Sequence, residues 1–233
     1  MLTRRHFLTA LAGTFSLGGL VSAYGMAIEP LYRLRTQRYA FTPKDWAGRA
    51  PLRIIALSDF HFCEPWMNLR RGEEIVAAAN ALGGDIIVLL GDYLSSMRFR
   101  SADVPLAEWS ALLGTLKAPL GVHAVLGNHD WWGDAEAMRR RGGATKAGEA
   151  LKQAGIKLYE NDVLHITEGR HRFWLAGLGD QISFLDLHRR DRSVPRGVDD
   201  LGKVLGAVNG DDPVILMAHE PDIFPKVPAR ISL

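Results

Sequence analysis

Residues 86–92 read IIVLLGD, and this stretch decides the fold. Its five consecutive apolar residues, three of them β-branched, predict a strand buried on both faces, which is typical of a parallel sheet. Gly91 permits a sharp backbone turn, and Asp92 then places a carboxylate just beyond the carboxyl end of the strand. The stretch therefore predicts a covered sheet and a functional group at its edge.

Similar strands alternate with segments of helical periodicity on both sides of this stretch. Gly142 and Gly143 interrupt the helical pattern in one of these segments. Alternation of strands and helices predicts a parallel sheet with helices on its faces. The sequence predicts strands at 52–57, 122–126 and 214–217, and helices at 69–82, 106–116, 135–154 and 201–208.

After Gly155 the predicted strands follow one another without helices between them, at 156–159, 163–167 and 173–178. Such closely spaced strands are typical of hairpins, which predicts a second, antiparallel-rich sheet. We expect this sheet to stack on the parallel one, so that residues 51–233 form one α/β domain.

The composition is that of a globular protein. Of the 233 residues, 47% are hydrophobic and 23% are charged, which excludes disordered and collagen-like chains. The single cysteine excludes a disulfide-stapled scaffold. Residues 1–27 carry two arginines and no acidic residue, and the formal charge of the chain is +2, so the remainder is neutral. A neutral body lacks the electropositive face that nucleic acids require, and we expect no nucleic-acid partner.

Potential metal ligands follow four of the predicted strands. Open α/β sheets bind small molecules and ions in a crevice beyond the carboxyl ends of their strands. We therefore expect these metal-binding side chains to meet in one such crevice. Any one of the motifs is common by chance, but four at successive strand ends indicate a metal centre. Mixed carboxylate, imidazole and amide ligands suit a divalent ion such as Mn, Fe, Zn or Ni. The four segments are SDFH at 58–61, GDY at 91–93, GNHD at 127–130 and AHEPD at 218–222.

Residues 1–27 are interpreted as an export signal. Arg4 and Arg5 precede a stretch from Phe7 to Ile28 that contains no Asp, Glu, Lys or Arg and is rich in small residues. This order is typical of an export signal, and the paired arginines resemble the twin-arginine signal of bacteria. The alternative is a membrane anchor, because a stretch of 22 residues is long enough to span a bilayer.

Residues 28–50 are interpreted as a solvated connector. The neighbouring Arg33, Arg35 and Arg38 favour contact with an anionic membrane surface. We therefore expect an exported protein, located in the periplasm or anchored at the outer face of the cytoplasmic membrane, with the twin-arginine export machinery as a partner.

The four strand-end motifs, in this order, resemble the calcineurin-like metallophosphoesterases over residues 51–233. The Arg-Arg leader, SDFH at 58–61 and AHEPD at 218–222 are similar to the exported bacterial phosphodiesterase branch of that family. The resemblance implies two stacked mixed sheets flanked by helices, a four-layer αββα sandwich. The family pattern continues with a Gly-His-x-His segment that this sequence does not contain, so we expect a domain that is incomplete at its C-terminus.

The resemblance also implies two divalent metal ions. Asp59 and His61 hold the first ion in such a site, and they are two residues apart, so in an extended segment they point to the same side. Asp92 bridges both ions, and Asn128 and His219 hold the second. The implied metal ligands are thus Asp59, His61, Asp92, Asn128 and His219.

Two further residues are implied to be catalytic. His129 is expected beside the phosphate and the leaving group, and Asp130 is expected to orient the imidazole of His129. The implied reaction is hydrolysis of a phosphoester by a metal-activated hydroxide. A general phosphodiesterase and a hydrolase of lipid-linked phosphate or pyrophosphate both fit these ligands. The alternative from another class is a non-catalytic metal-binding module with an incomplete site.

Overall fold

The structure is a computed structural model that describes residues 3–25, 29, 33–185 and 196–233. The chain divides into two units, Met1–Ala40 and Phe41–Leu233, and each is described by itself. In the first unit, α1 spans Arg4–Ala23, and Glu29 forms ion pairs with Arg33 at 3.7 Å and Arg35 at 3.2 Å. Among the helices in the described part of the chain, none has both the length and the apolar character needed to cross a membrane.

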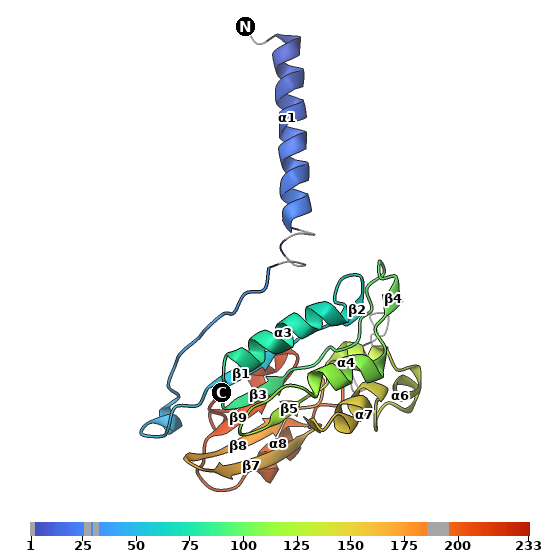
Figure 1. The fold of residues 1–233 in the computed structure, drawn as a ribbon. Coiled ribbons are helices and arrows are strands. Elements are labelled where there is room, and N and C mark those ends of the chain that lie inside the picture. Colours follow the sequence, from blue (N-terminus) through green and yellow to red (C-terminus); the bar gives the residue numbers. More distant parts are fainter. Residues whose placement is uncertain (1–2, 26–28, 30–32, 186–195) are drawn as a thin grey trace. The chain divides into compact units, whose positions relative to one another are not determined.

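A parallel sheet lies at the centre of the second unit (Figure 1). Its four strands run in the order β1-β3-β5-β6. Every residue of β3 is buried, as the apolar run at 86–90 predicts. The strands are β1 (Ile54–Leu57), β3 (Ile86–Leu89), β5 (Val122–Ala124) and β6 (Lys157–Leu158).

The two faces of this sheet have different partners. Side chains alternate along β3, so that Ile87 and Leu89 pack against the helices while Ile86 and Val88 pack against the second sheet. Gly142 and Gly143 separate α6 from α7, as the sequence predicts. The helices on the outer face are α3 (Leu69–Ala81), α4 (Leu106–Leu113), α6 (Ala135–Arg140) and α7 (Lys146–Gln153).

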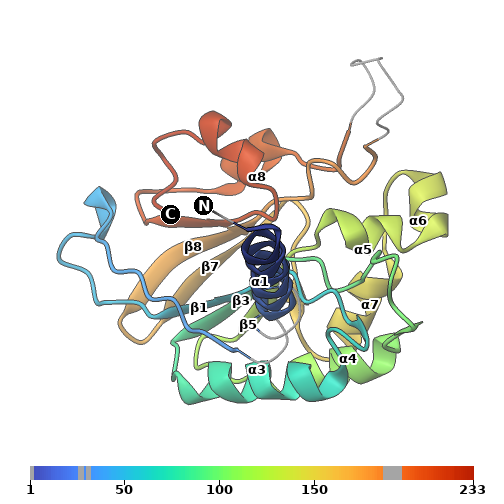
Figure 2. The same cartoon turned by 90° about the horizontal axis from the view of Figure 1, so that it is seen from above.

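The second sheet contains β7 (Asp162–Glu168), β8 (His171–Gly177) and β9 (Val214–Met217). β7 and β8 are antiparallel, and β8 and β9 are parallel. Its outer face packs against α8 (Leu201–Ala207) and the short 3-10 helix η3 (Pro221–Lys226). Figure 2 shows the resulting order of layers, with α3 and α4 on one side, the two sheets in the middle and α8 on the other. The predicted mixed α/β sandwich is confirmed.

Two strands lie in sheets that the sequence interpretation did not assign to them. The strand at 156–159 was expected in the antiparallel-rich sheet, but β6 extends the first sheet and is parallel to β5. The strand at 214–217 was grouped with the parallel strands, but β9 pairs with β8 in the second sheet. Both strands are short, with two residues in β6 and four in β9, so their sequences carry no information about which neighbour they pair with.

Residues that follow the first unit are packed on the second sheet. Trp46, in the 3-10 helix η2 (Lys44–Trp46), contacts Phe173 with ring centroids 5.7 Å apart. Arg49 forms an ion pair of 3.3 Å with Asp212. The later part of the segment interpreted as a connector therefore belongs to the folded second unit. A small sheet of β2 (Cys63–Glu64) and β4 (Ala102–Asp103) completes that unit.

Candidate metal centre

Asp92 lies at the centre of the candidate site, at the end of β3. Its side chain is 4% exposed, and its backbone is in the left-handed region with φ of 60°. The preceding Gly91 has φ of 100°, and a Cβ atom there would lie 2.4 Å from the backbone nitrogen of Gly127. Only glycine fits that conformation at that distance. The turn after β3 therefore brings the carboxylate of Asp92 against the turn that follows β5.

Two histidines approach the same oxygen of Asp92. Nε2 of His61 and Nε2 of His219 each lie 3.4 Å from Oδ2 of Asp92. Nδ1 of His61 lies 2.9 Å from the carbonyl oxygen of Leu94, and Nδ1 of His219 lies 2.8 Å from that of Leu90. A carbonyl only accepts hydrogen bonds, so each Nδ1 carries the proton and donates it. In the neutral imidazoles, Nε2 is then free to bind a cation.

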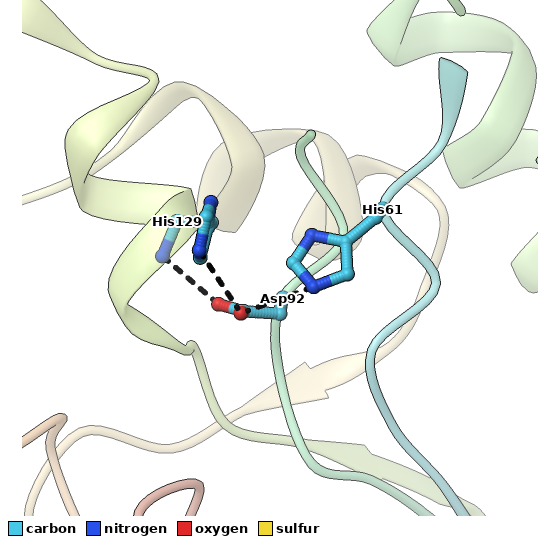
Figure 3. A group of neighbouring side chains, drawn as sticks. All are labelled: His61, Asp92 and His129. Carbon is cyan, nitrogen blue, oxygen red and sulfur yellow. Dashed lines mark hydrogen bonds and ion pairs between the residues drawn. The ribbon is translucent and has the colours of Figure 1, made fainter. Parts of the chain in front are cut away.

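His129 approaches Asp92 from α5 (Asn128–Trp132), as Figure 3 shows. Its backbone N–H donates to Oδ1 of Asp92 at 2.9 Å, and its Nε2 lies 3.9 Å from Oδ2. Nδ1 of His129 is hydrogen-bonded to the hydroxyl of Ser96 at 2.8 Å. The rings of His61 and His129 meet edge to face with centroids 4.7 Å apart.

The ligand atoms form two groups that share one residue. In each group the atoms lie within 4.8 Å of one another. One group is His61, Asp92 and His129, and the other is Asp59, Asp92 and His219. Asp92 belongs to both.

Asp59 and His61 are close, with 3.6 Å between Oδ1 and Nε2. The extended conformation expected for this pair is wrong, because both residues have positive φ, 58° and 46°. Their ligand atoms nevertheless lie close together, although the two residues fall into different groups. Asn128, the first residue of α5, is buried beside His129.

The prediction that Asp130 orients His129 is wrong. Both oxygens of the fully buried Asp130 carboxylate accept backbone N–H groups instead. Burial raises the pKa of Asp130 to about 7, with the bond from Gly127 opposing the rise. Asp130 therefore shapes the backbone of the site rather than the imidazole. The four donors, at 2.9–3.1 Å, are Asp92, Tyr93, Leu94 and Gly127.

Burial and mutual charge set the protonation of the centre. Burial disfavours the ionised form of Asp92, but the contact with His219 outweighs it and lowers the pKa of the carboxyl. Burial likewise disfavours the charged imidazole of His219, but Asp92 raises its pKa to about 9. Burial lowers the pKa of His129, which favours its neutral form. The ionised carboxylate of Asp92 thus attracts positive charge into a buried position, which in the absence of metal is the proton on His219.

These residues fit divalent cations. The donor set combines carboxylates with imidazoles whose Nδ1 atoms are held by backbone carbonyls, an arrangement typical of metal-binding histidines. A carboxylate has two oxygens and can bind one ion with each, which is the property that a residue shared between two groups requires.

Sequence reasoning missed two residues at this site. Ser96 lies on the loop after β3, and Asp180 lies beyond the end of β8 with its carboxyl buried. A lone serine in a polar loop carries no signal of its own. Asp180 follows a strand end as Asp92 does, and that position could have indicated it.

The sequence matches proteins of one family. The family model for calcineurin-like phosphoesterases matches residues 52–230. A metallophosphoesterase of Caenorhabditis elegans is 33% identical over 171 residues, which cover 72% of this chain and 31% of that protein. Phosphodiesterase YaeI of Escherichia coli is 32% identical over 189 residues, 77% of this chain and 62% of that protein.

A third relative is the UDP-2,3-diacylglucosamine pyrophosphatase LpxG of Chlamydia muridarum. It is 30% identical over 129 residues, which cover 52% of this chain and 37% of that protein. The chain therefore spans less than two thirds of the length of each of the three relatives. On the match over 52–230 and on these identities, the chain belongs to the calcineurin-like phosphoesterase family.

Proposed function

We propose that the protein hydrolyses phosphoesters with the help of two divalent metal ions. The observation that carries this proposal is the position of Asp92, which is buried and shared by both groups of potential ligands. Asp59, His61, Asp92, Asn128 and His219 would hold the ions. Bound ions of this kind neutralise the charge of a phosphoester and make water nucleophilic at neutral pH.

His129 is proposed to act on the leaving group. When the hydroxyl of Ser96 donates to Nδ1, the neutral imidazole carries its proton on Nε2, which faces Asp92. Burial lowers the pKa of this imidazole and keeps it neutral near pH 7. A proton at Nε2 is then available to a departing alkoxide.

The role of His129 is tested with substrates of different leaving groups. His129→Asn should slow hydrolysis of a methyl or alkyl phosphodiester more than that of a nitrophenyl ester, because nitrophenolate leaves with little need for a proton. Equal losses for the two ester types would assign His129 to binding of the phosphate or of an ion instead.

The substrate and the location are proposed from the leader and one relative. Arg4 and Arg5 before an apolar stretch support export by the twin-arginine route to the outer side of the cytoplasmic membrane. The name of the C. muridarum relative describes a pyrophosphatase of a diacylated sugar nucleotide. Together they favour a lipid-linked phosphate or pyrophosphate as the substrate.

The decisive experiment compares wild type with Asp92→Asn, an isosteric variant that lacks the shared carboxylate. Metal content is measured by elemental analysis after Mn²⁺ loading, and hydrolysis is measured on a phosphodiester, a phosphomonoester and a lipid pyrophosphate. We expect wild type to bind two ions and to hydrolyse at least one substrate, and the variant to lose both properties. Binding of Mn²⁺ without hydrolysis would instead establish a non-catalytic metal-binding module.

A further inference from the structure

Asp180 is a buried carboxylate with one oxygen left over. Its residue is 1% exposed. Oδ1 accepts the backbone N–H of Ile182 at 3.0 Å and the hydroxyl of Ser183 at 2.7 Å. Within the described part of the chain, Oδ2 is buried and has no hydrogen-bond partner. A buried polar atom of this kind destabilises the folded state unless a ligand or water satisfies it.

The strand register places Asp180 beside the metal centre. β8 and β9 are parallel, Gly177 is paired with Met217, and the N–H of Leu178 donates to the carbonyl of Met217 at 2.9 Å. The chain beyond β8 therefore continues next to the chain beyond β9, which carries His219. The charges of His219 and Asp92 both act on the Asp180 carboxyl, whose pKa is raised chiefly by burial.

The same turn also contacts the helix that carries His129. The carbonyl oxygen of Ser183 accepts the indole N–H of Trp132 at 3.0 Å, and the ring of Trp132 lies 4.9 Å from that of His129. Oδ1 of Asp180 supports this turn together with backbone hydrogen bonds, among them the N–H of Leu185 to the carbonyl of Ile182. Oδ2 contributes nothing to it, and so needs a different explanation.

We propose that Oδ2 of Asp180 accepts a hydrogen bond from a water molecule held at the metal centre, so that Asp180 is a positioning residue of that centre. This inference rests on the proposed function, because the water is held there by the ions. A water bridge satisfies the buried oxygen at little free-energy cost. Some carboxylates do not bind a metal ion themselves but hydrogen-bond to the groups that do. Mutation of such a carboxylate typically lowers metal affinity 10–100-fold.

The variant Asp180→Asn distinguishes the role of Oδ1 from that of Oδ2. The side-chain oxygen of asparagine can still accept from Ile182 and Ser183, while its NH₂ group takes the place of Oδ2 and cannot accept. The matched control is Ser183→Ala, which removes one bond to Oδ1 and leaves Oδ2 unchanged. Mn²⁺ affinity of the metal-free full chain is measured by calorimetry, and the unfolding temperature is measured without metal.

We expect Asp180→Asn to bind Mn²⁺ at least tenfold more weakly with an unfolding temperature close to that of wild type, and Ser183→Ala to retain wild-type affinity. Unchanged affinity in Asp180→Asn would overturn the inference, as would equal losses of affinity in the two variants. Should Asp180→Asn fail to fold, a crystal structure of Mn²⁺-loaded wild type decides, because a water must then lie within hydrogen-bond distance of Oδ2. Failure of wild type to bind Mn²⁺ would overturn the proposed function itself, which is a separate outcome.

Discussion

The carboxylate of Asp130 accepts the backbone N–H of Asp92 at 2.9 Å. Asp92 is the residue shared by the two ligand groups, and its backbone is thus fixed by a side chain that belongs to neither group. The same carboxylate binds the N–H of Gly127 at 2.9 Å. One buried side chain thereby ties the turn after β3 to the turn after β5.

This arrangement makes the stability of the domain sensitive to Asp130. In Asp130→Asn at pH 8, one carboxamide oxygen replaces two acceptors, so two buried N–H groups lose their partner. We expect a loss of about 2–4 kcal/mol in the free energy of unfolding, measured with urea. Asp162→Asn, at an exposed position, is the control and should change stability by less than about 0.5 kcal/mol. If Asp130→Asn instead weakened metal binding, or slowed hydrolysis of esters with poor leaving groups, while the free energy of unfolding stayed unchanged, this assignment would be contradicted.

Gly91→Ala should disrupt the turn that presents Asp92. The new Cβ would lie 2.4 Å from a backbone nitrogen, and φ of 100° is strained for alanine. We expect a loss of about 3 kcal/mol or more in stability, together with loss of Mn²⁺ binding. Gly206→Ala in α8 is the matched control, because nothing lies within 4 Å of its added Cβ. That variant should be neutral or stabilised by about 0.5–1 kcal/mol.

His123 gives the domain a pH dependence that is separate from the metal centre. It lies on β5, 4% exposed, with Nδ1 2.9 Å from the hydroxyl of Tyr159 and Nε2 2.8 Å from the carbonyl of Leu120. Burial lowers its pKa from 6.5, so the unfolded chain binds the proton more tightly than the folded chain does.

The contribution of His123 is therefore complete above pH 6.5 and is lost as the pH falls through the folded-state pKa. His123→Gln removes this titration, and we expect a flatter dependence of unfolding free energy on pH between about 5 and 7. The measurement is a series of urea titrations on both proteins. Identical slopes would show that His123 does not cause the acid sensitivity.

The leader is tested by replacing its arginine pair. We expect Arg4→Lys with Arg5→Lys to block export and to leave folded, active protein inside the cell, because the twin-arginine route depends on the pair. Cell fractionation followed by a phosphoesterase assay measures both properties. Undiminished export of the double variant would identify the apolar stretch as an ordinary signal or anchor.

The sequence predicted the layers of the fold better than the pairing of its strands. The burial of β3 follows directly from its unbroken apolar run, and the interruption between α6 and α7 follows from two glycines. The short β6 and β9 offered no such evidence, because pairing depends on contacts with residues far away in the chain. Local pattern therefore decides which segments become strands, while tertiary contacts decide which sheet they join.

The candidate site shows the same division. Asp92, His129 and His219 were predicted because each follows a recognisable strand, and the structure brings all three together. The role of Asp130 was predicted wrongly, because its sequence position beside His129 says nothing about which donors its oxygens meet. Ser96 reaches His129 only through the folded path of its loop, whereas the position of Asp180 after a strand end is a signal that sequence reasoning overlooked.

The position of His219 on the second sheet has a consequence for the order of assembly. Asp59, Asp92 and His129 are carried by the first sheet, which could form while the rest of the chain is still being synthesised. His219 joins them only when β9 has paired with β8 and the two sheets have closed on each other. Ions bound at such a site would cross-link the two sheets, because their ligands come from both. Metal uptake would therefore report that a chain has finished folding.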